Sequence, residues 1–266
     1  MKRSTISWCD YSGGDLNFVT GCTPVSEGCA NCYAAAIYKR FGRDFSKVLT
    51  CGGKLDRLFT KGFPAFDNVR GSYSRPLCFV CDTGDLFHEA VPVDFVRRAI
   101  GLMRWWRTDV DWVILTKRPE NIPGDILWPD NVWLGVTAEN QEMADKRIPL
   151  LLKVPAKVRF VSVEPMLERV DLMAWLRPCT WGCGLDEFGD CLGEPSCPDY
   201  RPRGLDWIIC GAESGAHRRS FDQAWAESLY LQSRAGEVPF FGKQDSGLRP
   251  GRPLLIRERQ IQEWPR

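Results

Sequence analysis

The sequence lacks an excess of charge of either sign. Its 266 residues include 35 Lys and Arg against 34 Asp and Glu, which gives a formal net charge of +1. Proteins that hold nucleic acid mainly by neutralising phosphates need a positive field over much of their surface. The balance therefore excludes a globally basic nucleic-acid binder and leaves room only for a local basic patch.

Long apolar runs are also missing. No stretch approaches the roughly 18 uncharged apolar residues that a transmembrane helix needs. The first residues, Met1 to Thr5, contain no apolar run of the kind found in signal peptides. Low-complexity tracts and internal repeats are absent from the sequence as well. We therefore expect a cytoplasmic globular protein that does not associate with membranes.

Cysteine, in contrast, is abundant. The chain has 12 cysteines, and a reducing cytoplasm disfavours disulfides, so their expected use shifts towards metal ligation or catalysis. Hydrophobic residues make up 44% of the chain and include 11 Trp and 14 Phe, which is enough for one sizeable core. Because this length is common for an α/β barrel, we expect residues 1–266 to form a single domain.

Short apolar segments alternate with segments of helical spacing along the chain. The apolar segments are rich in Val, Ile, Phe and Trp at successive positions, which is typical of strands buried on both faces of a parallel sheet. Helical spacing is found over 93–106 and 138–152. This alternation predicts an α/β fold, either a TIM-like barrel or an open, doubly wound sheet. The expected strands are 4–8, 77–81, 112–115, 132–136, 158–163, 207–210 and 239–241.

Polar clusters follow six of these strands. In a barrel all strand carboxyl ends converge on one face, where such enzymes build their sites, although open sheets also place sites at strand ends. Loops are polar in most proteins, but six successive clusters that mix acids, bases and amides favour a functional site. We therefore expect a parallel TIM-like barrel, complete or partial, with its site on this face. The clusters are residues 82–85, 116–119, 137–140, 164–165, 211–215 and 242–245.

Three cysteines, Cys22, Cys29 and Cys32, lie within eleven residues near the start of the chain. Cys29 and Cys32 are spaced to reach one metal, and Cys22 can supply a third thiolate from the facing part of the loop. Thiolates suit zinc and iron–sulfur clusters, and three of them leave one ligand position open. The residues favour an iron–sulfur cluster. The alternatives are a zinc site with a remote ligand such as Cys9 or Cys51, and unligated thiols.

A second cysteine group lies in segment 177–204, which interrupts the alternation of strands and helices. The segment is dense in Gly, Pro and Cys without periodicity, which indicates an insertion. It has few core-forming residues, and metal binding can supply the folding energy that burial does not. We expect a structural zinc site, with an accessory iron–sulfur cluster or no metal as alternatives. The ligands would be Cys179, Cys183, Cys191 and Cys197.

The other cysteines and the histidines carry weaker signals. Cys78, Cys81 and Cys210 lie on expected strands, so we interpret them as small core residues. His88 and His217 follow strand-end clusters, and we expect loop histidines rather than metal ligands or bases.

The chain resembles a known family over nearly its whole length. The clearest match is the segment 19–34, VTGCTPVSEGCANCYA. It looks like the signature of uncharacterised phage and bacterial proteins, a domain of unknown function of the phage Gp37/Gp68 type, whose members carry a three-cysteine loop near the N-terminus. This family is similar to radical S-adenosylmethionine enzymes in its barrel and its cysteine loop. Further matches are residues 85–87, 133–140 with 147–149, 159–165, 207–215 and 240–244.

The resemblance implies a radical S-adenosylmethionine-like enzyme. A [4Fe–4S] cluster on Cys22, Cys29 and Cys32 would leave one iron to bind the amino and carboxylate groups of S-adenosylmethionine, and reductive cleavage would yield a radical. The phage association suggests a nucleic acid or nucleotide as substrate. The alternative is a zinc-stabilised, non-catalytic protein of phage origin that binds nucleic acid or a partner. The strand-end groups expected to bind the cofactor are Glu139, Glu164, Glu213, Ser214, Lys117 and Lys243.

Overall fold

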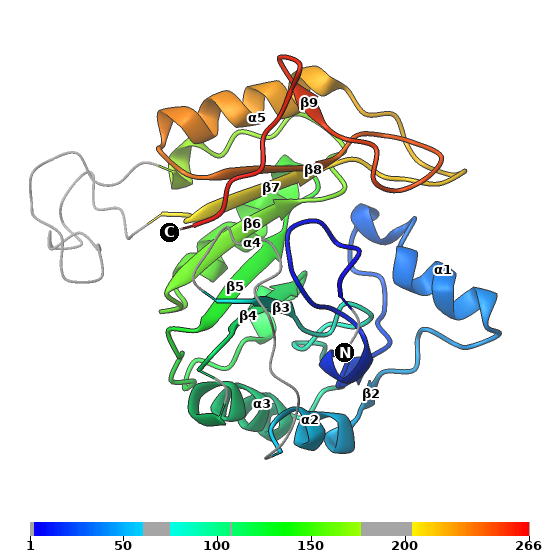
Figure 1. The fold of residues 1–266 in the computed structure, drawn as a ribbon, viewed down its shortest axis with the longest axis vertical. Coiled ribbons are helices and arrows are strands. Elements are labelled where there is room, and N and C mark those ends of the chain that lie inside the picture. Colours follow the sequence, from blue (N-terminus) through cyan, green and yellow to red (C-terminus); the bar gives the residue numbers. More distant parts are fainter. Residues whose placement is uncertain (1–2, 61–74, 107, 177–203, 266) are drawn as a thin grey trace, which may run out of the picture.

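The computed structural model describes residues 3–60, 75–106, 108–176 and 204–265 (Figure 1). Strands and helices alternate through most of this part of the chain, as the sequence predicts. In chain order the elements are η1 (Gly14–Leu16), β1 (Val19–Thr20), η2 (Glu27–Cys29), α1 (Tyr33–Arg40), β2 (Leu49–Thr50), α2 (Gly52–Leu58), β3 (Leu77–Phe79), α3 (Val93–Trp106), β4 (Asp111–Thr116), η3 (Pro119–Asn121), β5 (Val132–Thr137), α4 (Gln141–Leu152), β6 (Val158–Val163), η4 (Met173–Trp175), β7 (Trp207–Gly211), α5 (Gln223–Ala235), β8 (Phe240–Gln244), β9 (Leu255–Ile256) and β10 (Arg259–Gln260).

The main sheet consists of six parallel strands in the order β3-β4-β5-β6-β7-β8. Each strand lies beside the one that precedes it in the chain, so every connection advances in the same direction. A doubly wound sheet would instead reverse its order at a switch point. The sequential order curls the sheet into a half-barrel, which confirms the α/β class and a partial TIM-like barrel.

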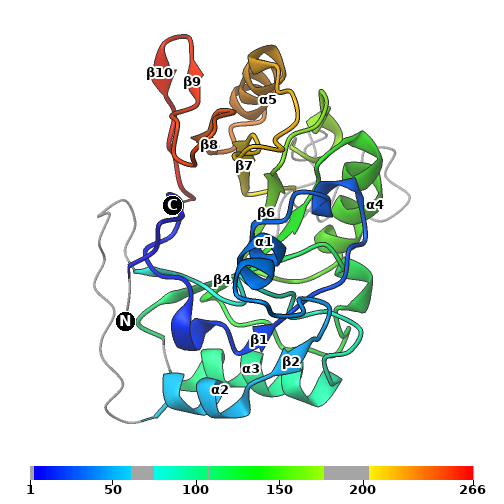
Figure 2. The same cartoon turned by 90° about the vertical axis from the view of Figure 1, so that its right-hand side faces the viewer.

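Helices α3, α4 and α5 pack on the outer face of the curled sheet (Figures 1 and 2). Their apolar stripes, which include Ile100, Ile148 and Leu229, share one buried cluster with outward-facing strand residues such as Val161. Helix α1 lies apart from these three helices, on the side towards which the strands point (Figure 1). The layer of helices therefore covers the sheet and leaves the carboxyl ends of the strands to the N-terminal part of the chain.

Aromatic side chains fill the inner face of the half-barrel. Trp207 is fully buried at their centre, with ring centroids 6.3 Å from Trp8, 6.0 Å from Trp133, 5.6 Å from Phe160 and 6.1 Å from Phe241. Tilted and edge-on arrangements at these separations are the favoured ones for aromatic pairs. The interior is therefore a packed core, and the space for chemistry lies at its rim.

The two edges of the half-barrel are paired by the ends of the chain. Tyr11 forms a parallel bridge with Cys78 of β3, and Gln262 forms an antiparallel bridge with Phe241 of β8. The prediction of a strand at 4–8 is wrong. This segment forms bends and turns, and Trp8 packs in the aromatic interior. The indole Nε1–H of Trp264 then donates to the carbonyl oxygen of Trp8 at 3.2 Å, which links the two chain ends.

Several local predictions are confirmed. Strand β6 and helix α3 have the predicted bounds, whereas α4 begins at Gln141 because the side chain of Asn140 caps it by accepting from Met143 N at 2.9 Å. The cysteines expected in the core, at 78, 81 and 210, are buried. In the part of the chain that the structure describes, no helix has the length and apolar character needed to cross a bilayer. The expected insertion at 177–204 lies outside the described residues, except for Gly204.

Candidate functional site

The three cysteines lie in a loop, residues 21–32 (the cysteine loop), that crosses the carboxyl ends of the parallel strands. The loop starts beside the end of β3, where Gly21 N donates to the carbonyl oxygen of Thr83 at 2.9 Å. Gly21 has φ +83°, and a Cβ there would lie 2.1 Å from the carbonyl oxygen of Lys47. Only glycine fits this backbone conformation and close approach. The sequence before Cys22 thus fixes where the loop enters the site.

Arg118, which follows β4, holds the first part of the loop. Its Nη1 is 3.5 Å from Cys22 Sγ, and its Nη2 donates to the carbonyl oxygen of Thr23 at 3.0 Å and to the hydroxyl oxygen of that residue at 2.8 Å. Burial raises the pKa of Cys22 to about 11, the nearby Asp85 carboxylate adds to this, and the Arg118 charge acts in the opposite direction. A buried guanidinium beside a thiol favours its thiolate form, which is the form that binds metals.

His88 supports the same part of the loop. Its Nε2 is 2.9 Å from Thr23 Oγ1, and its Nδ1 accepts from Ala90 N at 3.0 Å, which leaves the ring proton on Nε2. Burial and the charge of Arg118 lower the pKa of His88, so the ring is neutral at pH 7. This histidine, expected to be an ordinary loop residue, therefore donates a hydrogen bond to the cysteine loop.

Glu139, which follows β5, binds the centre of the loop. The Gly28 N–H donates to Glu139 Oε1 at 3.2 Å, and Arg147 Nη1 lies 2.9 Å from Glu139 Oε2. The Glu139 side chain is fully buried. Burial alone would raise its pKa, but a hydrogen bond from Ser26 and the charge of Arg147 keep the pKa below the ordinary value. Since a Cβ on Gly28 would lie 2.8 Å from Glu139 Cδ, the contact also requires glycine at that position.

Glu213, which follows β7, binds the last part of the loop. Asn31 Nδ2 donates to Glu213 Oε2 at 3.0 Å, and Arg219 Nη2 lies 2.5 Å from Oε1. Arg219 Nη1 also reaches Glu27 Oε1 at 3.3 Å. Burial acts to raise the pKa of Glu213, but hydrogen bonds from Arg219 and Asn31 keep it below the ordinary value. The hydroxyl of Tyr33, the first residue of α1, donates to the carbonyl oxygen of Asp82 after β3.

The remaining predicted strand-end residues lie at the same rim but do not bind the loop through any contact that the structure records for its described residues. Lys243 Nζ lies 3.4 Å from Glu164 Oε1, and Ser162 Oγ donates to Glu164 Oε2 at 3.3 Å. Lys117 is half-buried close enough to lower the pKa of Glu139. Ser214 is half-buried and forms a bridge with Gly247.

The thiols of the loop are free and half-buried, and Cys29 lies near enough to Cys22 to influence its ionisation. Within the described ranges, no three side chains of His, Cys, Asp or Glu are grouped as a metal site. Metal ligands commonly gather only when the metal binds, because binding and local folding are coupled. The donor chemistry of three thiols in one loop fits a thiolate-bound iron–sulfur cluster. The second expected group, Cys179, Cys183, Cys191 and Cys197, lies outside the described residues.

Sequence reasoning missed the arginines that pair with the strand-end acids. Arg147 lies on α4 among the buried residues Ala144, Ile148 and Leu151. A charged residue in the apolar stripe of a helix needs a buried partner, and this signal was present in the sequence. Arg219 had no comparable signal, because it lies in an irregular segment between β7 and α5.

A comparison with protein families gives a match over nearly the whole chain. Residues 3–257 match the family described as "Protein of unknown function (DUF5131)". The chain belongs to this family. No curated protein and no solved structure gives a significant match. The assignment confirms a resemblance to an uncharacterised family over nearly the whole chain, and it states neither phage origin nor a relation to radical S-adenosylmethionine enzymes.

Proposed function

We propose that this protein is an iron–sulfur enzyme of the radical S-adenosylmethionine type, with a [4Fe–4S] cluster held by Cys22, Cys29 and Cys32. The observation that carries the proposal is the position of the cysteine loop. Side chains that follow β4, β5 and β7 bind the loop, so it lies over the face where parallel barrels build their active sites. A metal that served only to stabilise the fold would not need this location.

The three thiols suit the proposed cluster. When bound, a cluster with three thiolate ligands supplies an open iron for the amino and carboxylate groups of S-adenosylmethionine, and its chemistry is the reductive cleavage of that cofactor. Arg118 Nη1 lies 3.5 Å from Cys22 Sγ, and its charge opposes the burial that raises the pKa of this thiol, so it would favour the thiolate when a metal binds. Glu139 and Glu213 fix the loop through Gly28 and Asn31.

The strand-end groups not committed to the loop are the ones suited to contact a cofactor or substrate. The Glu164 carboxylate can accept hydrogen bonds from an ammonium group or ribose hydroxyls, and Lys117 or Lys243 can neutralise a carboxylate or phosphate. The contact between Glu164 and Lys243 is long, at 3.4 Å, so a ligand can replace it at little cost. Ser214 adds a hydroxyl at the same rim. A nucleic acid or nucleotide is the proposed substrate class.

Anaerobic reconstitution with iron and sulfide tests the proposal. The wild-type chain should take up about four iron atoms and show an absorbance band at about 400 nm. Changing Cys22, Cys29 or Cys32 to Ala should each abolish this absorbance. Cys51→Ala is the matched control, because Cys51 is also a half-buried free thiol but lies outside the loop. Full iron content in the three loop variants would contradict the assignment.

Two further results separate the alternatives. Addition of S-adenosylmethionine should change the electron paramagnetic resonance spectrum of the reduced protein, and 5′-deoxyadenosine should form under reducing conditions. A colourless protein with stoichiometric zinc would instead support the non-catalytic binder. Loss of that zinc in Cys9→Ala or Cys51→Ala would identify the remote ligand.

A further inference from the structure

An open pocket of about 540 Å³ lies at the carboxyl ends of β7 and β8. Its wall is formed by residues 246–252 of the loop after β8 and by Arg218 of the segment after β7. The two segments are joined, because Gly215 N donates to the carbonyl oxygen of Gly247 at 2.9 Å. The pocket therefore belongs to the same face of the half-barrel as the proposed cluster site.

Positive charge is concentrated in this pocket. Three arginines line it, Arg218, Arg249 and Arg252. Arg252 is paired with Asp245, whose Oδ2 lies 3.3 Å from Arg252 Nε and also accepts from Gln223 Nε2 at 3.1 Å. Arg218 Nη1 donates to the carbonyl oxygen of Gly215 at 3.0 Å, and among the described residues neither Arg218 nor Arg249 has a recorded ion pair with an acidic side chain. Two guanidinium groups are thus left without an acidic partner in the described chain.

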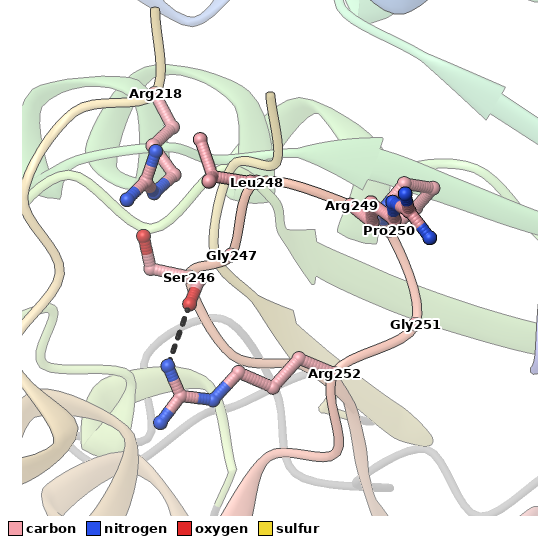
Figure 3. Close-up of a pocket in the computed structure, with 8 residues that line it drawn as sticks. All are labelled: Arg218, Ser246, Gly247, Leu248, Arg249, Pro250, Gly251 and Arg252. Carbon is pink, nitrogen blue, oxygen red and sulfur yellow. Dashed lines mark hydrogen bonds between the residues drawn. The ribbon is translucent and has the colours of Figure 1, made fainter. Parts of the chain in front are cut away.

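The pocket wall has a defined shape. Asp245 N donates to the carbonyl oxygen of Arg252 at 2.9 Å, and Gly251 N donates to Gln244 Oε1 at 3.2 Å, so the loop is closed at its base. Figure 3 shows the side chains of Arg218 and Arg252 on opposite sides of Ser246, with Arg252 donating to the carbonyl oxygen of Ser246 at 3.2 Å. A closed loop that presents arginines is preorganised for an anion, since less side-chain and backbone freedom is lost on binding.

We propose that Arg218 and Arg252, which lie on either side of Ser246, form a binding site for a phosphate group of a nucleotide or a polynucleotide, with Arg249 as a further positive charge on the far side of the same loop. Guanidinium groups bind phosphate with paired hydrogen bonds, and the loops after the last two strands of α/β barrels often bind phosphate. Arg219, adjacent to Arg218, reaches Glu27 in the cysteine loop. Asn31 Nδ2 of that loop also donates to the carbonyl oxygen of His217, the residue before Arg218, at 2.8 Å, so a ligand held in the pocket can extend towards the cysteine loop. Only this link to the substrate rests on the proposed function; phosphate binding does not.

Binding to the 266-residue protein as purified, without iron reconstitution, tests the site with three probes: inorganic phosphate, adenosine monophosphate and a fluorescein-labelled single-stranded oligothymidylate. The test variant changes the three pocket arginines to Gln. The matched control changes Arg234, Arg257 and Arg259 to Gln, which removes the same charge from α5 and the neighbouring β9–β10 hairpin. We expect the pocket variant to weaken binding about tenfold or more and to lower the salt slope for the oligonucleotide by up to about 3, with little change in the control.

The outcomes are distinct. Binding of phosphate and the mononucleotide alone identifies a nucleotide site, and tighter binding of the oligonucleotide identifies a polynucleotide site. Equal loss of affinity in both triple variants, or no binding of any probe at millimolar concentration, would overturn the proposal. Arg249→Gln alone should also weaken binding without loss of thermal stability, because this side chain has no partner among the described residues. The measurement needs no cluster, so a failed iron reconstitution leaves its result unaffected.

Discussion

Replacing Arg147 by Met should remove the ion pair that fixes the centre of the cysteine loop. The Arg147 and Glu139 side chains are 3% and 0% exposed, and the pair is 2.9 Å apart. Removing one partner of a buried pair costs about 3–5 kcal/mol, because the other charge is left uncompensated. The variant also loses the hydrogen bond from Arg147 to the carbonyl oxygen of Thr137. We therefore expect the free energy of unfolding at pH 7 to fall by about 3–5 kcal/mol.

The pH dependence of this loss identifies its cause. In the wild type the pKa of Glu139 lies below its ordinary value of 4.5, so its ionised form contributes stability that is lost as the pH falls through the folded pKa. Without Arg147, burial raises the pKa of Glu139, and the variant gains stability as the pH falls from 7 to 5. In the variant Glu139 can avoid a buried charge by taking up a proton, which costs about 1.36 kcal/mol for each pH unit above its ordinary pKa. The destabilisation from the buried charge is therefore at most about 3.4 kcal/mol at pH 7 and about 0.7 kcal/mol at pH 5.

Urea unfolding at pH 7 and pH 5, followed by tryptophan fluorescence, measures both quantities. Arg257→Met is the matched control: its partner Glu227 is 2.7 Å away, but the side chains are 64% and 42% exposed, so the loss should stay within about 1 kcal/mol. Adding Glu139→Gln to Arg147→Met should recover much of the stability at pH 7. A loss below about 1 kcal/mol at pH 7, or an equal loss at both pH values, would refute the reasoning.

Two more predictions concern the loop and the sheet. Gly28→Ala should lower the free energy of unfolding by about 1–3 kcal/mol and speed amide hydrogen exchange in the cysteine loop, because the new Cβ would lie 2.8 Å from Glu139 Cδ. Gly124→Ala is the control, because a Cβ at Gly124 would have no atom within 4 Å. Equal effects of the two substitutions would contradict the contact between Gly28 and Glu139. Burial raises the pKa of Asp111 to about 6, although the charge of Arg75 acts to lower it. Between about pH 4 and pH 6 the folded state therefore keeps this carboxyl protonated while the unfolded state loses the proton, and the free energy of unfolding falls as the pH rises. In urea unfolding measured over this pH range, Asp111→Asn should reduce the decrease in the free energy of unfolding by up to about 3 kcal/mol. An unchanged dependence of stability on pH would show that the pKa of the Asp111 carboxyl is not raised.

Much of the fold follows from local patterns. Strand β6 and helix α3 have the bounds that the sequence predicts, because a short segment rich in Val and Phe and a proline before an amphipathic helix are strong local signals. The N-terminal segment 4–8 contains only two apolar residues, Ile6 and Trp8, and forms no strand, because Trp8 packs in the aromatic interior of the half-barrel. Tertiary packing decided that case, and a short apolar segment cannot show in advance which partner will bury it.

The sequence predicts where along the sheet the site residues lie, but it does not predict which residues they contact. The clusters after the strands include Glu139 and Glu213, and the structure places both at the carboxyl ends of the strands, in contact with the cysteine loop. Their partners could not be read from the sequence, because Gly28 is 111 residues from Glu139 and Asn31 is 182 residues from Glu213. Strand order brings the acids to one rim, but only the path of the cysteine loop decides which of them bind it.

The arginines of this face divide into two groups by their partners. Arg118, Arg147 and Arg219 each contact a carboxylate and a backbone carbonyl of the described chain, so their charges are used in holding the structure together. Arg218 and Arg249 have no acidic partner among the described residues, although the net charge of the whole chain is only +1. Composition averages charge over the molecule, whereas ligand binding depends on charge left uncompensated at one place. The unpaired arginines are therefore the part of this face where we propose that a ligand of opposite charge binds.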